Sequence, residues 1–119
     1  MNPTGDTYLK DQNDQQKSNP TTWVVRPDPD LADLIPSFQE NRKIELADLK
    51  LARARSDYEF IRRMAHTWKG ICRPYGFVHL ETLSRSLEEA GEREAGPDVD
   101  TVLNEMTDYL ENVRVVYDS

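Results

Sequence analysis

The chain has 119 residues, of which 37% are hydrophobic and 31% are charged, and this suits one small domain with a modest core. No apolar run approaches the roughly 18 residues that a membrane-spanning helix needs. The net charge of −7 disfavours nucleic acid as a partner, because duplex binding depends on Lys and Arg that neutralise phosphates. The N-terminus lacks the apolar centre of a secretory signal, and the single cysteine, Cys72, cannot form an internal disulfide, so the sequence predicts a cytoplasmic protein.

The first 20 residues are polar, with almost no apolar side chains, and predict a disordered tail. A short apolar patch, Trp23-Val24-Val25, follows and leads into the breaker run Arg26-Pro27-Asp28-Pro29. The patch either docks on the edge of the domain or acts as a linker, and the sequence does not decide between the two. We therefore divide the chain into a flexible tail and linker over residues 1–29 and a helical domain over residues 30–119.

From Asp30 onward, apolar residues recur at helical spacing in four segments. The first segment contains Pro36, which a helix tolerates in its first turn, so we expect a short helical turn followed by a longer helix. The apolar face of this segment is formed by Leu31, Leu34, Ile35, Phe38, Leu46 and Leu49.

Ser56 and Glu59 have the spacing of a capping box, which predicts the start of the second helix. This helix is expected to end near Arg73, because Pro74 lacks a backbone N–H and its ring clashes with the preceding turn. The apolar face of the second helix contains Ile61, Met64, Ala65, Trp68 and Ile71 or Cys72.

The third helix is expected to fade after Gly91, and the fourth to begin at Gly96-Pro97, since proline suits the first helical position. The third helix buries Phe77, Leu80, Leu83 and Leu87, and the fourth buries Val99, Val102, Leu103, Met106, Tyr109, Leu110, Val113 and Tyr117. No segment alternates with period two for long enough to form a strand. The sequence thus predicts an all-α fold, an antiparallel four-helix bundle with a short extra N-terminal helical turn.

A polar stripe lies opposite the apolar face of the second helix. Its residues are spaced by three or four positions, so they share one side of the helix, and Arg63 flanks them. Each has an ordinary explanation: a lone surface histidine is usually just solvated, basic residues favour a helix C-terminus, and a helical glycine can permit close packing. The stripe consists of Arg62, His66, Lys69, Gly70 and Arg73.

Taken together, these residues favour phosphoryl transfer. An exposed, unprotonated imidazole such as His66 is a nucleophile, and phosphoryl transfer mainly requires alignment and positive charge near the phosphoryl oxygens. Lys69 lies one turn further on and can supply that charge. Gly70 removes a side chain beside the histidine, so that another protein can approach closely. A glycine inside a helix costs about 1 kcal/mol relative to alanine, so its presence invites an explanation of this kind.

The segment from Ala65 to Phe77, AHTWKGICRPYGF, resembles the signature of histidine-containing phosphotransfer (HPt) domains. In that signature a small residue precedes the phosphoaccepting histidine, a lysine stands three residues on, a glycine follows it, and a further glycine closes the helix. The resemblance extends over about Asp30 to Tyr117, which is most of the chain.

The resemblance implies a phosphocarrier of bacterial two-component phosphorelays, and not an enzyme on its own. The histidine takes a phosphoryl group from a receiver-domain aspartate, or from a histidine or hybrid kinase, and passes it to a receiver-domain aspartate. Mg²⁺ is expected in the response-regulator receiver partner, with no cofactor in this chain, which is expected to be a monomer. The predicted site residues are His66 as phosphoacceptor, Lys69 as support for the phosphoryl group, Arg62, Arg63, Gly70 and Arg73 as docking residues, and Gly76 as the structural turn.

Two residues depart from the family pattern. Trp68 stands where leucine or methionine is usual, and it must fit into the core or reach the surface beside His66. Pro74 stands where small residues are usual, so the helix kinks or stops early. Elsewhere, His79 is interpreted as a surface residue, because its position matches no usual zinc spacing. Cys72 is expected to be half-buried, and Glu88, Glu89, Asp98 and Asp100 are interpreted as solvated charges.

Two other functions stay open. An HPt-like docking module would bind receiver or kinase domains without carrying phosphate, although docking alone needs neither His66 nor Lys69. A small helical enzyme or metal protein would need a second catalytic group, and the sequence offers none.

Overall fold

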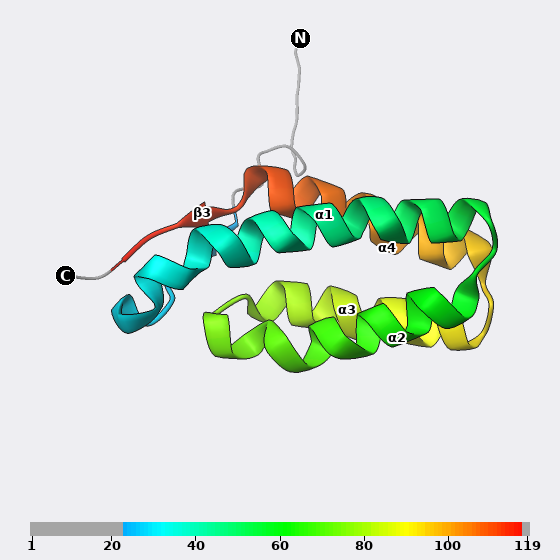
Figure 1. Cartoon of the computed structure of the whole chain (residues 1–119), viewed down its shortest axis with the longest axis horizontal. Helices are drawn as coiled ribbons and strands as arrows, with labels where there is room; N and C mark the ends of the chain where they lie inside the picture. Colours follow the sequence, from blue (N-terminus) through cyan, green and yellow to red (C-terminus); the bar gives the residue numbers. More distant parts are fainter. Residues whose placement is uncertain (1–22, 118–119) are drawn as a thin grey trace, which may run out of the picture.

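The computed structural model describes residues 23–117, which form four antiparallel helices (Figure 1). Each helix packs against the next one in the chain, and the last also packs against the first, so the four helices enclose a single core. The predicted all-α four-helix bundle is confirmed, whereas residues 1–22, most of the predicted tail, lie outside the described residues. The helices are α1 (Ile35–Ala54), α2 (Tyr58–Ile71), α3 (Val78–Glu92) and α4 (Gly96–Asn112).

A short 3₁₀ helix, η1 (Pro29–Leu34), precedes α1 and corresponds to the predicted extra turn. The carboxylate of Asp28 caps it by accepting a hydrogen bond from the backbone N–H of Asp30 at 2.9 Å. Pro36 then lies in the first turn of α1, where its missing N–H has no intrahelical partner to lose. The division of the first segment at this proline is confirmed.

The predicted capping box at Ser56 is wrong, because Ser56 ends α1 instead of starting α2. Its φ of 56° places it in the left-handed region, where it occupies the position that follows the C-cap of α1. Two closing bonds, from Ser56 N to Arg53 O and from Asp57 N to Ala52 O, complete this Schellman-type end. The cap of α2 is Asp57, whose carboxylate accepts from the backbone N–H of Phe60 at 3.1 Å.

The second helix ends at Ile71, two residues before the predicted end, and a 3₁₀ turn, η2 (Arg73–Tyr75), contains Pro74. Gly76 follows with a φ of 91°, a conformation that favours glycine. A Cβ at this position would lie 3.2 Å from the Cα of Pro27, so the segment before η1 rests directly on this turn. The turn reverses the chain and sends α3 back along α2.

Two very short strands, one near each end of the described chain, pair with each other, a feature that the sequence did not predict. Strand β2 (Val24–Val25) pairs in parallel with β3 (Arg114–Val115). The apolar patch at Trp23 therefore docks on the edge of the domain, and α4 ends at Asn112 instead of continuing to Tyr117. The run of β-branched residues after Asn112 favours this extended ending.

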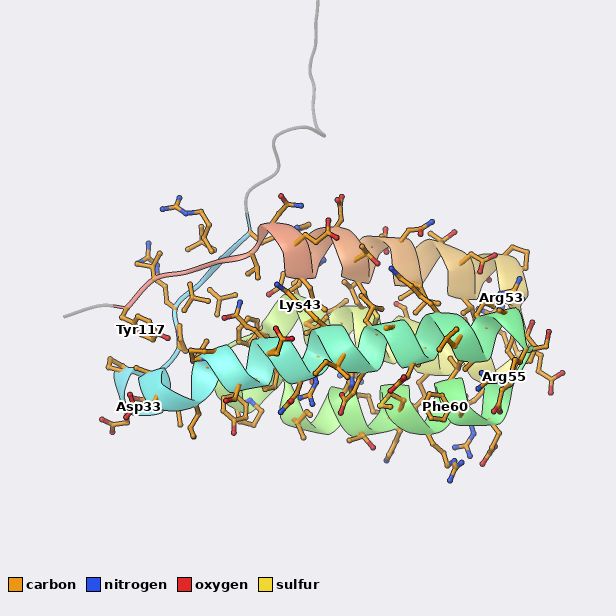
Figure 2. All side chains as sticks on the ribbon, turned by 45° about the horizontal axis from the view of Figure 1, so that its top comes forward. Asp33, Lys43, Arg53, Arg55, Phe60 and Tyr117 are labelled. Atoms are coloured by element: carbon orange, nitrogen blue, oxygen red, sulfur yellow. The ribbon has the colours of Figure 1, made fainter. Side chains whose placement is uncertain are left out.

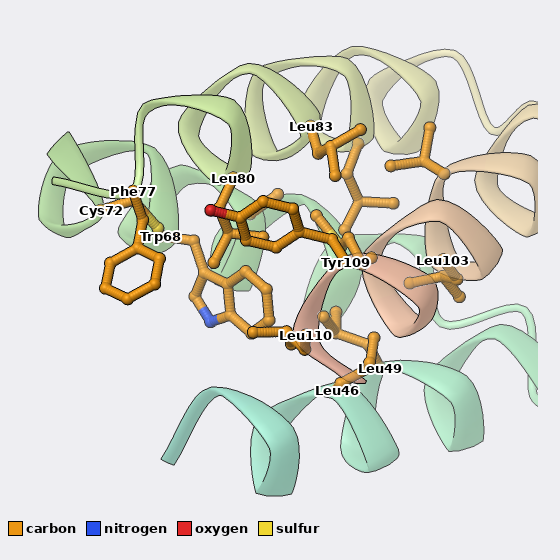
Figure 3. Close-up of a cluster of buried hydrophobic side chains, with 14 of the residues drawn as sticks. Leu46, Leu49, Trp68, Cys72, Phe77, Leu80, Leu83, Leu103, Tyr109 and Leu110 are labelled. Carbon is orange, nitrogen blue, oxygen red and sulfur yellow. The ribbon is translucent and has the colours of Figure 1, made fainter. Parts of the chain in front are cut away.

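The core lies between all four helices, and its two largest fully buried side chains are Trp68 and Tyr109. Figure 3 shows both rings among leucines from α1, α3 and α4. Charged side chains such as Lys43 and Arg55 are exposed on the outside of the bundle (Figure 2). Among residues 23–117, no helix is both long and apolar enough to cross a membrane.

Candidate functional site

The outer face of α2 presents His66 to solvent. The cap at Asp57 starts the helix so that Ile61, Ala65 and Trp68 point inward and are fully buried. His66 comes one residue, or about 100° of helical rotation, after Ala65 and so turns outward. Its side chain is 66% exposed.

A glutamate of α3, Glu88, lies between His66 and Lys69. Its Oε2 is 2.8 Å from Nδ1 of His66, and its Oε1 is 2.7 Å from Nζ of Lys69. The Glu88 side chain is only 12% exposed, and that of Lys69 is 29% exposed, so the histidine is the most accessible of the three. The two helices thus combine one carboxylate, one ammonium group and one exposed imidazole.

The protonation of this group follows from Glu88. The hydrogen bond from Lys69 lowers the pKa of the Glu88 carboxyl below its usual value, His66 acts in the same direction, and burial opposes both. The carboxylate is therefore ionised at neutral pH and can only accept hydrogen bonds. Nδ1 of a neutral His66 must then carry the proton, which leaves the lone pair on Nε2.

Close packing of α3 on α2 brings Glu88 within reach of His66. Gly91 lies one turn after Glu88, and a Cβ there would approach the backbone nitrogen of Arg62 to 3.3 Å. Arg62 in turn lies one turn before His66. A glycine at this crossing lets the two helix backbones approach closely beside the site.

The predicted docking glycine, Gly70, stands on open surface. A Cβ built on it would meet no atom within 4 Å, so the space beside it is empty. Since Gly70 lies one turn after His66, this open surface adjoins the histidine.

The three predicted docking arginines are paired with glutamates. Arg62 and Arg63 contact Glu59 at 2.8 and 3.4 Å, and Arg73 contacts Glu81 at 2.7 Å. Within the described part of the chain, none of the three makes a hydrogen bond or ion pair with His66. The polar stripe is therefore nearly balanced in charge, because its arginines and Lys69 are all paired with glutamates.

A family model of the Hpt domain matches residues 33–115. The chain belongs to the Hpt domain family. Hpt domains are phosphocarrier modules of two-component phosphorelays, and the family implies interaction with receiver domains and kinases. No curated protein and no solved structure matches the chain.

This Hpt domain places Trp68 in the core and not beside its histidine. The indole is fully buried, and its Nε1 donates to Oε1 of Glu45 on α1 at 2.7 Å. The same oxygen accepts from Nε of Arg42 at 2.9 Å. Of the two possibilities for this unusual residue, the structure selects the core.

Three other interpretations from the sequence are wrong. Glu88 is not a solvated charge but the partner of His66 and Lys69. His79 is not a simple surface residue, because the ring of Trp23 stacks on it at 4.2 Å, and burial lowers its pKa. Cys72 is fully buried instead of half-buried, and burial raises the pKa of its thiol to about 12. In the part of the chain from Trp23 to Tyr117, no cluster of three or more His, Cys, Asp or Glu side chains is arranged to hold a metal ion.

Proposed function

We propose that this Hpt domain carries a phosphoryl group on Nε2 of His66 and passes it between receiver-domain aspartates, or from a kinase to a receiver. The observation that carries the proposal is the contact of 2.8 Å between Glu88 and Nδ1 of a ring that is 66% exposed. This contact fixes the tautomer and leaves Nε2 as the free nucleophile.

In the proposed transfer step, one bond to phosphorus forms as another breaks. As the Nε2–P bond forms, the bond between phosphorus and the receiver's aspartyl oxygen breaks, and its electron pair remains on the leaving carboxylate. Nδ1 keeps its proton, so the phosphorylated ring becomes a cation. The Glu88 carboxylate, already in contact, stabilises that positive charge, and a Mg²⁺ ion held by the receiver partner would supply positive charge at the phosphoryl oxygens.

Lys69 supports the phosphoryl group without leaving Glu88. An ammonium group has three N–H donors, and the contact with Glu88 at 2.7 Å occupies one of them. The remaining donors are available to a phosphoryl oxygen on the neighbouring ring.

Docking uses the open surface at Gly70 and the paired arginines around it. The side chains of Arg63 and Arg73 are 66% and 63% exposed, so a partner reaches them without unfolding anything. Because exposed ion pairs contribute little to stability, Arg63 can exchange its exposed partner Glu59 for a group of the receiver at small cost, whereas Arg73 is paired with Glu81, whose side chain is only 11% exposed.

The first experiment is phosphotransfer from a labelled receiver domain in the presence of Mg²⁺. The wild-type protein should take up an acid-labile, base-stable label, and His66→Gln should take up none. The chain has two histidines, so His79→Gln is the matched control and should keep the label. Label that persists in His66→Gln would disprove the assignment.

The same assay separates the phosphocarrier from the docking module. A wild-type protein that binds receiver domains but accepts label from none of them would be a docking module, and the phosphocarrier proposal would then be wrong.

Lys69→Ala should slow transfer by about tenfold to a hundredfold while receiver binding changes much less. The reason is that the ammonium group acts mainly on charge that develops on the phosphoryl oxygens during transfer. Single-turnover rates and binding titrations with one receiver give the two values. Equal losses in rate and in binding would show that Lys69 only positions the partner.

A further inference from the structure

A second buried carboxylate of α3, that of Glu81, contacts two arginines. Its Oε1 accepts hydrogen bonds from Nε and Nη2 of Arg73, in the turn after α2, at 3.1 and 2.7 Å. Its Oε2 lies 3.3 Å from Nη2 of Arg85, one turn further along α3. The Glu81 side chain is only 11% exposed, whereas those of Arg73 and Arg85 are 63% and 55% exposed. We call Arg73 and Arg85 the arginine pair.

The arginine pair keeps one positive charge after its contact with Glu81. One carboxylate faces two guanidinium groups, and no other carboxylate of residues 23–117 forms an ion pair with either of them. Each guanidinium group has five N–H donors, of which Arg73 uses two and Arg85 uses one in these contacts. The remaining donors belong to side chains that are more than half exposed, on a protein whose net charge is −7. The pair is therefore a local cationic site on an acidic protein.

The burial of Glu81 holds the arginine pair in a defined geometry. Glu59 also contacts two arginines, Arg62 and Arg63, but its own side chain is 62% exposed and can move together with them. Glu81 is packed between α2 and α3, and Arg73 donates two hydrogen bonds to one of its oxygens. A partner that binds groups already held in place loses less side-chain entropy than a partner that must order them.

The arginine pair lies on the same face of the bundle as His66. Glu81 precedes Glu88 by seven residues, which is nearly two turns or about 10.5 Å along α3, so both carboxylates lie on the side that faces α2. Arg85 lies between the two glutamates in the sequence, and Arg73 follows His66 by seven residues. An ordinary interface buries about 800 Å² on each partner, so a protein that docks on His66 also covers surface at this distance.

We propose that the arginine pair binds a carboxylate of the receiver domain that docks on His66, and that Arg85 thereby helps to determine which receivers bind. The inference rests on the proposed function, since it names the chemistry of the receiver beside the phosphoacceptor. Charge complementarity selects a carboxylate, because its two oxygens match the parallel N–H donors of a guanidinium group. On an acidic protein, a local cationic site also orients an acidic partner. Glu81 is the positioning residue, because it acts through the two arginines.

The test is a binding titration, in about 0.15 M salt, with the receiver domain of the same genome that forms the tightest complex with the wild-type protein. Arg85→Gln should raise the Kd by about threefold to tenfold, and the charge reversal Arg85→Glu by about tenfold to a hundredfold. Lys50→Glu is the matched control, because it changes the net charge equally at an exposed residue on the side of α1 that faces α4. It should change the Kd by less than about twofold, since this salt screens distant charges.

A double-mutant cycle identifies the carboxylate. Each Asp and Glu on the surface of the receiver is changed to its amide, and one such change should cause little further loss when it is combined with Arg85→Gln. Arg85 and Lys50 are both exposed, so their substitution leaves the core intact. Equal effects of Arg85→Glu and Lys50→Glu, or strictly additive losses for every carboxylate, would overturn the proposal.

The variant Glu81→Gln distinguishes fixed geometry from net charge. The amide removes one negative charge, so charge alone predicts tighter binding of an acidic partner. Loss of the buried carboxylate also releases both guanidinium groups, and the Kd should therefore rise by about threefold or more. Tighter binding would overturn the positioning role of Glu81. Should Glu81→Gln unfold, the variants of Arg85 decide the question.

The failures of the two proposals are distinguishable. A receiver that gives no label to His66 but loses affinity for Arg85→Glu would disprove the phosphocarrier function and leave the carboxylate site standing. A receiver that labels His66 and binds Arg85→Glu as tightly as the wild type would overturn the carboxylate site and leave the phosphocarrier function standing.

Discussion

Helix α2 is held by a glutamate on each of its two sides, and the two arrangements have the same parts. On the side of α3, Glu88 accepts hydrogen bonds from the ring of His66 and from Lys69. On the side of α1, Glu45 accepts hydrogen bonds from the ring of Trp68 and from an arginine of α1. In each case one carboxylate joins a ring N–H of α2 to a cation.

The two arrangements differ in exposure and in the number of ring nitrogens. The indole of Trp68 is fully buried and has one nitrogen, which the glutamate occupies. The imidazole of His66 is 66% exposed and has a second nitrogen that Glu88 does not occupy. The comparison teaches that the same hydrogen-bond pattern stabilises the fold where the ring is buried and prepares a nucleophile where the ring is exposed.

The largest expected effect is on the free energy of unfolding, and it distinguishes the buried ring of Trp68 from the exposed ring of His66. Trp68→Ala should lower the free energy of unfolding by about 3–5 kcal/mol, because it leaves a cavity in the core and removes a donor from Glu45. His66→Gln should change it by less than about 0.5 kcal/mol, as expected for an exposed side chain. Urea unfolding followed by circular dichroism measures both. Similar losses in the two variants would show that the exposed arrangement is also structural.

The next largest effect distinguishes the role of Glu88 in phosphotransfer from the role of Glu45 in stability. Glu88→Gln should slow phosphotransfer by about tenfold to a hundredfold, because the amide no longer fixes the tautomer or stabilises the cationic ring. Glu45→Gln should leave the rate unchanged and lower the free energy of unfolding by about 1 kcal/mol. Single-turnover transfer rates and urea unfolding are measured for both variants. A rate loss in Glu45→Gln as large as that in Glu88→Gln would contradict the assignment.

Much of this molecule is readable from the sequence because the relevant signals are local. Helical periodicity predicts all four helices, and spacing by three or four residues predicts that His66, Lys69 and Gly70 share one face. The error at Ser56 is also local in origin. Both Ser56 and Asp57 are good N-caps, and the sequence does not show that the end of α1 already requires Ser56 in a left-handed conformation.

The role of Glu88 was not predicted from the sequence, because it depends on the register between two helices. Periodicity places it at the edge of the apolar face of α3 but does not say what it meets. A signal was present nonetheless: the turn at Gly76 lies ten residues after His66 and twelve before Glu88, so an antiparallel hairpin brings the two opposite each other. Gly91 adds the close approach that completes the contact.

The pairing of β2 with β3 was unpredictable for a different reason. Each strand has only two residues, too few to show an alternating pattern, and its partner lies at the other end of the domain. The apolar patch at Trp23 was visible, but its contact with His79 depends on the folded bundle.

A smaller effect follows from the lowered pKa of Glu88. A carboxyl whose pKa is lower in the folded state than in the unfolded state stabilises the fold fully above its unfolded value, and this contribution is lost as the pH falls through the folded value. The advantage in stability of the wild type over Glu88→Gln should therefore shrink as the pH falls below about 5. Urea unfolding of both proteins at several pH values measures it. A difference that grows as the pH falls below about 5 would contradict the ionised Glu88 on which the tautomer argument depends.

The smallest effect compares the glycine on the open side of α2 with the one at the helix crossing. Gly70→Ala should raise the free energy of unfolding by about 0.5–1 kcal/mol, because alanine favours the helix and its Cβ meets no atom within 4 Å. Gly91→Ala should show no such gain in stability, since its Cβ would approach the backbone of Arg62 to 3.3 Å. A gain in stability at Gly70 means that the natural glycine is not there for the fold. Receiver titrations should then show weaker binding for Gly70→Ala and much weaker binding for Gly70→Glu, while unchanged binding in both would remove Gly70 from the docking surface.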